Sequence, residues 1–216
     1  MDTLILKGDA VEDLQKAAAL LSAGETVAFP TDTVYGLGAN AQSDTAVEKI
    51  YEAKGRPSDK PLILLIHSPA QLLEFADFVS DAAARLMDAF WPGSLTLIFP
   101  LRKGAVSNKV TRGQSTIGVR IPNHPVALEL IRMADVPVAA PSANLSGNPS
   151  PSTAEQVAAD LDGRIAAIVA GGTCSVGQAS TIVDVSGDTP MILRKGAISK
   201  EQIEQVLGYS IKAVND

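Results

Sequence analysis

Hydrophobic positions recur along this chain with two periods, one typical of helices and the other of strands. The helical period predicts helices at residues 11–21, 45–55, 69–90, 125–134, 153–161 and 199–208. Short apolar runs and alternating segments predict strands at residues 26–29, 62–66, 95–99, 117–121, 136–140, 165–169, 181–185 and 191–193. Because strands and helices alternate throughout, the pattern predicts an α/β layer fold around one sheet.

Capping residues sharpen several of these boundaries. In a capping box, a residue with a hydroxyl group is followed three positions later by Glu or Gln. Such pairs occur at Thr45–Glu48, Thr153–Gln156 and Ser199–Gln202, where we expect helices to begin. Glycines that can end a helix are Gly24, Gly55 and Gly208. The final residues, 211–216, carry neither signal, so we expect a connection or a frayed end there.

Length and composition limit the class of protein. The chain has 216 residues, of which 46% are hydrophobic, which suits one sizeable core and a single domain over residues 1–216. No apolar run approaches the ~20 residues of a membrane helix, and the N-terminus lacks the basic start of a secretory signal. Cys174 is the single cysteine and is expected to be a small core residue. These features favour a cytoplasmic protein in a reducing compartment.

The charge of the chain bears on nucleic-acid binding. The net charge is −6, whereas proteins that bind nucleic acid strongly usually present a basic face. Basic residues gather between Arg102 and Arg112, but a solvated loop explains them equally well. The composition therefore argues against strong binding of tRNA or other nucleic acid.

Four polar segments lie at the ends of predicted elements, where α/β proteins place their sites. They are residues 30–38, 54–61, 115–122 and 141–151. Taken alone, the first is best explained as a polar turn whose glycines relieve backbone strain. The last is crowded with hydroxyls and amides, which suit a nucleotide but also an ordinary surface loop.

Cations in the second segment indicate an anionic ligand. Lys54, Arg56 and Lys60 lie within seven positions, and Gly55 and Pro57 restrict the shape of the loop. Arg binds two oxygens in a fork and Lys adds a point charge, so such a loop is a good phosphate receptor. The helix dipole also favours cations at a helix end, so a purely structural explanation stays equally open.

A further cation lies inside a predicted strand. Arg120 is on the face opposite the apolar stripe, together with Thr116 and Gly118. An Arg in this position is often solvated, but here the glycine leaves space and the threonine supplies a hydroxyl, which suits a carboxylate or a phosphate. Arg194, at the end of the last predicted strand, adds one more cation.

Several common chemistries lack their signatures. No phosphate-binding P-loop motif occurs, and the G-x-G-x-x-A match at residues 36–41 comes too long after its strand for a dinucleotide fold. His67 and His124 are the only histidines, and both are expected to be satisfied structural residues. With few acid–base or covalent candidates, the sequence favours catalysis by positioning and charge stabilisation.

Six stretches of sequence then indicate a family. They are Pro-Thr-Asp-Thr-Val-Tyr-Gly-Leu-Gly at 30–38, Lys-Gly-Arg-Pro at 54–57, Thr-Ile-Gly-Val-Arg at 116–120, Ser-Ala-Asn-Leu-Ser-Gly at 142–147, Ser-Thr-Ile-Val-Asp at 180–184 and Leu-Arg-Lys-Gly at 193–196. In this order they resemble the YrdC-like family of threonylcarbamoyl-AMP synthases. The resemblance covers residues 10–208, and the K-x-R and S-x-N pairs are specific when both occur in order.

The resemblance implies a twisted mixed sheet with a large concave cavity, and a reaction. In that reaction the amine of L-threonine captures bicarbonate or CO₂ as a carbamate, which attacks the α-phosphorus of ATP and displaces pyrophosphate. A separate tRNA threonylcarbamoyl transferase complex then uses the product. Longer members add a C-terminal domain that this sequence does not contain.

The resemblance also implies roles for individual residues. Lys54, Arg56, Ser142 and Asn144 would be catalytic and contact the phosphates and the carbamate. Arg120 and Thr33 would bind threonine. Lys60, Thr116, Ser150 and Arg194 would complete the ATP site. Mg²⁺ is expected to arrive with ATP and not in a protein cage.

Two departures from the family pattern concern threonine recognition, and two other functions stay open. Leu65 stands where some members carry a His, and Ala140 where some carry a hydroxyl. One alternative is a binder of double-stranded RNA or tRNA without this turnover. The other is the carbamoyl-adenylate chemistry of hydrogenase-maturation proteins, which uses carbamoyl phosphate.

Overall fold

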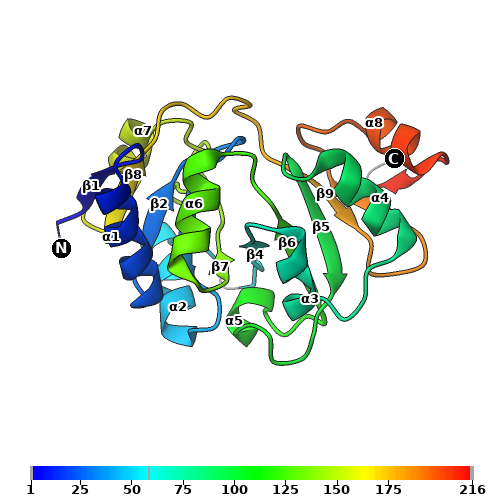
Figure 1. Ribbon diagram of the computed structural model, residues 1–216, viewed down its shortest axis with the longest axis horizontal. Helices are drawn as coiled ribbons and strands as arrows, with labels where there is room; N and C mark the ends of the chain where they lie inside the picture. Colours follow the sequence, from blue (N-terminus) through cyan, green and yellow to red (C-terminus); the bar gives the residue numbers. More distant parts are fainter. Residues whose placement is uncertain (1, 58, 215–216) are drawn as a thin grey trace.

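The computed structural model describes residues 2–57 and 59–214, which fold around one mixed sheet (Figure 1). Its strands are β1 (Leu4–Lys7), β2 (Val27–Phe29), β3 (Gly36–Asn40), β4 (Ile63–Leu65), β5 (Leu95–Pro100), β6 (Thr116–Arg120), β7 (Val138–Ala139), β8 (Ala167–Ala170), β9 (Thr181–Asp184), β10 (Met191–Arg194) and β11 (Lys212–Ala213). The α-helices are α1 (Val11–Ser22), α2 (Asp44–Lys54), α3 (Leu72–Phe75), α4 (Asp81–Phe90), α5 (Asn108–Thr111), α6 (Pro125–Ala134), α7 (Ala154–Leu161) and α8 (Lys200–Leu207), with a 3₁₀ helix η1 (Pro69–Gln71) before α3. The predicted α/β fold is confirmed.

Parallel and antiparallel pairs are mixed along the sheet. The strand order is β1-β8-β2-β3-β7-β4-β6-β5-β9-β10-β11. At its centre β6 runs parallel to β4 and antiparallel to β5, with Leu65 opposite Arg120 and Leu97 opposite Val119. This register places Arg120 inside the sheet, because β6 has a hydrogen-bonded neighbour on each side.

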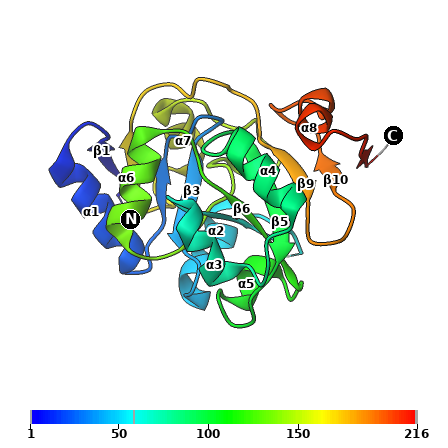
Figure 2. The ribbon, with the colours of Figure 1, turned by 45° about the vertical axis from the view of Figure 1, so that its right-hand side comes forward.

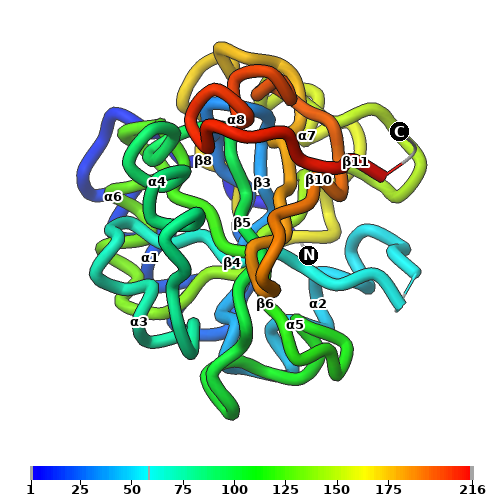
Figure 3. Tube along the Cα trace, turned by 90° about the vertical axis from the view of Figure 1, so that its right-hand side faces the viewer, coloured from blue at the N-terminus to red at the C-terminus, as the bar shows by residue number. Residues whose placement is uncertain are grey.

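Helices cover the sheet in separate groups. Helices α1 and α6 pack against each other, and Figure 1 shows them side by side over β2 and β7. They bury a small core that includes Leu21, Phe29 and Leu130. Helix α2 packs on β3 within a larger core that continues to α4 and α8. Figure 2 shows α4 beside β5, and Figure 3 shows α8 over β10 and β11.

Most predicted boundaries are confirmed. Helix α6 begins and ends at the predicted residues, and capping boxes form at Thr153 and Ser199. Gly55 and Gly208 end their helices in the left-handed conformation, with φ of 55° and 78°, which glycine adopts without steric cost. Local capping chemistry was sufficient to place the ends at Thr153, Ser199, Gly55 and Gly208.

Two expectations about elements were wrong. Helix α2 is capped by Ser43, whose hydroxyl accepts from the Ala46 N–H, whereas Thr45 lies inside the first turn. The helical pattern over residues 69–90 is confirmed as separate helices, because the chain is extended at Ala76 between α3 and α4. The C-terminal residues expected to fray include β11, which pairs with β10, while residues 215–216 lie outside the described part.

The glycine-rich segment after β2 is a strand, not a loop. Strand β3 pairs antiparallel with β2, with Gly38 opposite Val27. A Cβ on Gly38 would lie 2.7 Å from the Phe29 ring and 2.9 Å from Val138, so this glycine allows close packing in the sheet. Its role is therefore structural, and the weak dinucleotide match has no counterpart in the fold. None of the helices in the described residues is long and apolar enough to cross a membrane.

Candidate active site

Two hollows in the surface share part of their walls. The larger has a volume of about 410 Å³ and the smaller about 380 Å³. Arg56, Lys60 and Ser142 line both. The larger hollow is also lined by the predicted site residues Thr33, Thr116, Arg120, Ser150 and Arg194, and the smaller by Lys54 and Asn144. The structure thus brings all the predicted site residues to one place.

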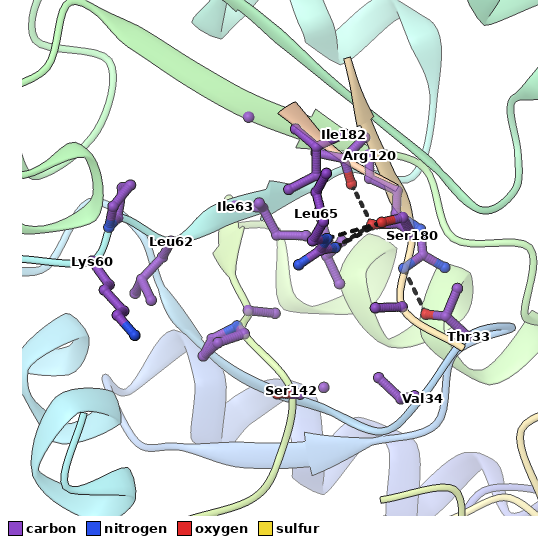
Figure 4. Close-up of a pocket in the computed structure, with 18 of the residues that line it drawn as sticks. Thr33, Val34, Lys60, Leu62, Ile63, Leu65, Arg120, Ser142, Ser180 and Ile182 are labelled. Carbon is purple, nitrogen blue, oxygen red and sulfur yellow. Dashed lines mark hydrogen bonds between the residues drawn. The ribbon is translucent and has the colours of Figure 1, made fainter. Parts of the chain in front are cut away.

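The sheet explains why these distant residues meet. Thr33 follows β2, Lys54 ends α2, and the segment from Ser142 to Ser150 follows β7. Arg120 and Arg194 end β6 and β10. Figure 4 shows Lys60 at one end of the larger hollow, Thr33, Arg120 and Ser180 at the other, and Ser142 between them. The site is therefore built at strand and helix ends, as in other α/β proteins.

Positive charge dominates both hollows although the protein is acidic overall. The cations that line them are Lys54, Arg56, Lys60, Arg120 and Arg194. No Asp or Glu occurs among their described lining residues, in a chain whose net charge is −6. Like charges gathered in a partly dry space repel one another, so the arrangement favours ligands that carry several negative charges.

Lys54 is a buried cation held by backbone carbonyls. Its side chain emerges from the last turn of α2 into a site where the residue is only 2% exposed. The ammonium donates to the carbonyls of Ser142 and Asn144, the latter at 2.6 Å. Burial, followed by repulsion from Arg56, lowers its pKa to about 8. An ammonium has one donor more than these two carbonyls use, and that donor can reach a ligand.

Arg56 lies at the junction of the two hollows. Its Nη2 donates to the Pro61 carbonyl at 3.1 Å, while its buried Nε has no partner among the described residues. Burial lowers the pKa of the guanidinium, which stays charged at neutral pH. Behind it, the Tyr51 hydroxyl donates to the Lys60 carbonyl at 2.8 Å and the Arg112 guanidinium lies 3.8 Å from the centre of the Tyr51 ring. These contacts hold the loop that carries Arg56 and Lys60.

Arg120 is 4% exposed and forms a buried ion pair with Asp32. Its guanidinium also donates to Thr33 Oγ1 at 2.8 Å and to the Gly93 carbonyl at 2.9 Å. Burial lowers the pKa of Arg120, and Asp32 opposes that shift. The sequence placed Asp32 in a polar turn and gave it no role. A carboxylate next to the predicted site residue Thr33 could have indicated a partner for one of the cations.

The Asp32 carboxylate accepts hydrogen bonds from three groups. It accepts from Ser94 Oγ at 2.7 Å and from the Asn123 N–H at 3.0 Å, in addition to Arg120. Asp32 does not line either hollow. It therefore fixes the direction of Arg120, which itself lines the larger hollow and keeps two of its five N–H groups outside these contacts.

Arg194 approaches the same end of the larger hollow from β10. Its Nε and Nη2 donate to the Ser180 carbonyl at 3.1 and 2.8 Å, and Nη2 also reaches Ser180 Oγ at 3.0 Å. Burial lowers the pKa of Arg194, and repulsion from Arg120 lowers it further. An anion bound near both arginines would relieve that repulsion.

Apolar side chains complete the larger hollow. Leu65 and Ala140, the two departures from the family pattern, both line it, next to Val34 and Ile63. His67 is not among the residues that line either hollow. Cys174 is buried as predicted, but the expectation of a satisfied His124 was wrong, because its buried Nδ1 has no partner within the described residues.

Comparison with known proteins identifies the family. Residues 19–196 match the family model Sua5_yciO_yrdC, which is described as "Telomere recombination". This chain belongs to the Sua5/YciO/YrdC family. It is 56% identical over 195 residues to a Bacillus subtilis threonylcarbamoyl-AMP synthase, covering 90% of this chain and 56% of the relative. The chain thus spans about half the length of that curated relative.

Other family members extend the comparison. A Mycobacterium tuberculosis protein named a putative threonylcarbamoyl-AMP synthase is 40% identical over 192 residues, which is 89% of this chain and 88% of the relative. The crystal structure of P. abyssi Sua5 complexed with L-threonine superposes with a TM-score of 0.92 at 43% identity, covering 98% of this chain and 62% of that one. The family and the mixed-sheet fold are therefore established, while the roles of the individual site residues stay predictions.

The depressed pKa of Lys54 gives the site an expected pH dependence. Affinity for pyrophosphate should fall as pH rises through about 8, because the neutral amine no longer attracts an anion. The dissociation constant, measured by calorimetry from about pH 6.5 to about pH 9.5, should rise more steeply for the wild type than for Lys54→Arg, whose guanidinium stays charged. An equal pH dependence of the two dissociation constants would show that Lys54 does not take part in binding pyrophosphate.

Proposed function

We propose that this chain makes threonylcarbamoyl-AMP from L-threonine, bicarbonate or CO₂, and ATP, with release of pyrophosphate. One observation carries the proposal: five cations and several hydroxyls line two joined hollows in which no described lining residue is a carboxylate. The threonine carboxylate, the carbamate and the triphosphate are all anions, so their assembly needs such a neutralising wall.

The shape of the site suggests how the reactants are divided. We place threonine at the end of the larger hollow formed by Thr33 and Arg120, because the guanidinium suits the threonine carboxylate. We place the α-phosphate at the junction, beside Arg56, Lys60 and Ser142, which line both hollows. The departing pyrophosphate would then occupy the smaller hollow, with Lys54 and Asn144.

The chemistry follows from this arrangement. The threonine amine adds to CO₂ and loses a proton, or adds to bicarbonate and loses water, to give a carbamate. A carbamate oxygen then forms a bond to the α-phosphorus while the bond to the bridging oxygen breaks, and pyrophosphate leaves with the electron pair. No His, Cys, Asp or Glu occurs among the described lining residues, so the protein contributes by alignment and by charge stabilisation.

Magnesium belongs to the substrate in this proposal. Among the described residues, no group of three or more His, Cys, Asp or Glu side chains is placed to hold a metal ion. The polar side chains that line the hollows are cations, hydroxyls and the amides of Gln114 and Asn144, without the carboxylates that Mg²⁺ prefers. We therefore propose that Mg²⁺ enters on the triphosphate of ATP, as it does in many phosphoryl-transfer sites.

The wider setting is also proposed. We propose that residues 1–216 act as one catalytic domain in the cytoplasm, and that the product passes to a separate tRNA threonylcarbamoyl transferase complex. Direct contact with tRNA would be weak, because the net charge of −6 opposes the approach of a polyanion.

Pyrophosphate release with each substrate omitted in turn tests the proposed function. Release should need ATP, threonine and bicarbonate together, since the carbamate that attacks the α-phosphorus forms only from threonine and bicarbonate. Release that ignores threonine would refute the proposal. Turnover with carbamoyl phosphate in place of threonine and bicarbonate would favour the chemistry of hydrogenase-maturation proteins, and strong tRNA binding without turnover would favour an RNA-binding protein.

A further inference from the structure

The carboxylate of Asp160 lines neither hollow, but it holds a segment that lines the smaller one. Asp160 lies near the C-terminal end of α7. Its Oδ2 accepts from the Leu145 N–H at 2.9 Å, and its Oδ1 accepts from the Asn148 side-chain amide at 2.8 Å. Both donors belong to the segment after β7 that also carries Ser142 and Asn144. One carboxylate therefore links α7 to a segment that contributes predicted site residues.

Further hydrogen bonds extend from this anchor to the site. The Asn148 carbonyl accepts from the Asn144 side-chain amide at 2.9 Å, so an anchored residue orients Asn144. The Ser146 N–H donates to the Lys54 carbonyl at 2.8 Å. The Lys54 ammonium in turn donates to the carbonyls of Ser142 and Asn144. A shift of the anchored segment would therefore displace Asn144 and the two carbonyls that hold the ammonium.

Asp160 also supplies negative charge near Lys54. Burial and then repulsion from Arg56 lower the pKa of Lys54 to about 8, and the charge of Asp160 opposes them. Lys60 lines the same hollow as a further cation, whereas residues 142–148 contain no charged side chain. Among residues 2–57 and 59–214, Asp160 is the carboxylate that acts on the ammonium. Its charge therefore favours the protonated form of Lys54 near neutral pH.

The place of Asp160 behind the anchored segment suits an ionised side chain. A carboxylate inside either hollow would repel phosphate oxygens at short range, whereas Asp160 lines neither hollow and still acts on the ammonium. The N–H groups of Leu145 and Asn148 reach two different oxygens, which a carboxylate has and a neutral carboxamide lacks. Position 160 therefore suits an ionised acid better than a neutral amide.

We propose that Asp160 is a positioning residue of the site, which fixes the segment carrying Ser142 and Asn144 and holds the Lys54 ammonium as a cation toward the departing pyrophosphate. The proposal rests on the proposed function, because that function supplies pyrophosphate as the leaving group. Asp160 touches no reactant and acts through Lys54 and Asn144. Its loss should therefore change both the affinity for pyrophosphate and the pH at which that affinity declines.

Pyrophosphate binding by Asp160→Asn across a range of pH tests the proposal. The variant removes the charge and one of the two acceptor oxygens at nearly constant size. Its dissociation constant, measured by calorimetry, should exceed that of the wild type about tenfold at neutral pH. The loss of affinity on raising the pH should also begin at a lower pH, because Lys54 would give up its proton more readily. Asp160→Glu, which keeps the charge, should retain the wild-type pH profile.

Two further variants and the contrary results complete the test. Asp162→Asn removes the same charge at an exposed residue directly after α7, and its affinity and pH profile should equal those of the wild type. Asn148→Ala removes one anchor and no charge, so it should weaken binding without a shift of the pH profile, and it tests the anchor even if Asp160→Asn does not fold. An unshifted pH profile in Asp160→Asn, an equal shift in Asp162→Asn, or unchanged binding in Asn148→Ala would each overturn the proposal while leaving the proposed function intact. Failure of the wild type itself to bind pyrophosphate would overturn both.

Discussion

Replacement of Arg56 by alanine should lower kcat/KM for ATP by about two to three orders of magnitude while the protein stays folded. Arg56 lines both hollows, and no other arginine does, so its charge can act on the phosphorus during the reaction. The fold should tolerate the change because the side chain donates to one carbonyl, that of Pro61, and its Nε has no partner among the described residues.

Steady-state kinetics and a thermal melt measure this prediction together. Arg102→Ala is the matched control, since Arg102 is an exposed arginine that lines neither hollow, and its kinetics should match those of the wild type. Full activity in Arg56→Ala would show that Arg56 does not contribute to the reaction. Loss of the folded state in that variant would assign Arg56 to structure.

Replacement of Asp32 by asparagine should lower stability by about 3–5 kcal/mol, because it leaves the charge of Arg120 buried without a counter-ion. The pair is deeply enclosed, with 5% of the Arg120 side chain and 7% of the Asp32 side chain exposed. In a protein of this size the loss corresponds to a fall in Tm of roughly 10 °C. The KM for threonine should rise as well, since Arg120 would no longer be held toward the hollow.

Denaturant unfolding and kinetics separate the two effects. Glu25→Gln breaks a partly exposed pair with Lys49 and is the control, with an expected loss below about 1 kcal/mol. The double variant Asp32→Asn with Arg120→Met should recover much of the lost stability, because no unpaired charge remains. If the free energy of unfolding of Asp32→Asn equalled that of the wild type, Asp32 would not stabilise the position of Arg120.

Much of the site could be predicted from the sequence because each part is carried by a short local segment. Lys54 and Arg56 are fixed by the end of α2 and the glycine that follows it. The polar face of β6 follows from strict alternation, so Thr116, Gly118 and Arg120 had to lie together. The chemistry of each segment could be read from its own residues. The family could be inferred because the segments occur in the order that is typical of its members.

Partners that are distant in sequence could not be predicted. Asp32 and Arg120 are 88 positions apart, and Arg194 meets Ser180 across a bend of 14 positions. Whether a polar side chain faces a ligand or a neighbour depends on such pairings, which only the folded sheet defines.

Errors in the fold came from weak or conflicting local signals. Strand β3 carries two glycines and follows a polar turn, so its sequence indicated a loop, yet close packing of Phe29 on Gly38 makes the glycine necessary. Strands β1 and β11 and helix α5 have two to four residues each, too few for a periodic pattern to emerge. Tertiary contacts decide the structure of such short segments.

Identification of the product by mass spectrometry shows whether threonine, bicarbonate and ATP are joined in one molecule. The protein would be incubated with ATP, L-threonine and isotopically labelled bicarbonate, with and without each substrate. We expect an adenylate that carries threonine and the label together, formed in step with pyrophosphate and strongly reduced in Arg56→Ala. An adenylate without the label, or consumption of ATP to ADP and phosphate with no such adduct, would contradict this expectation.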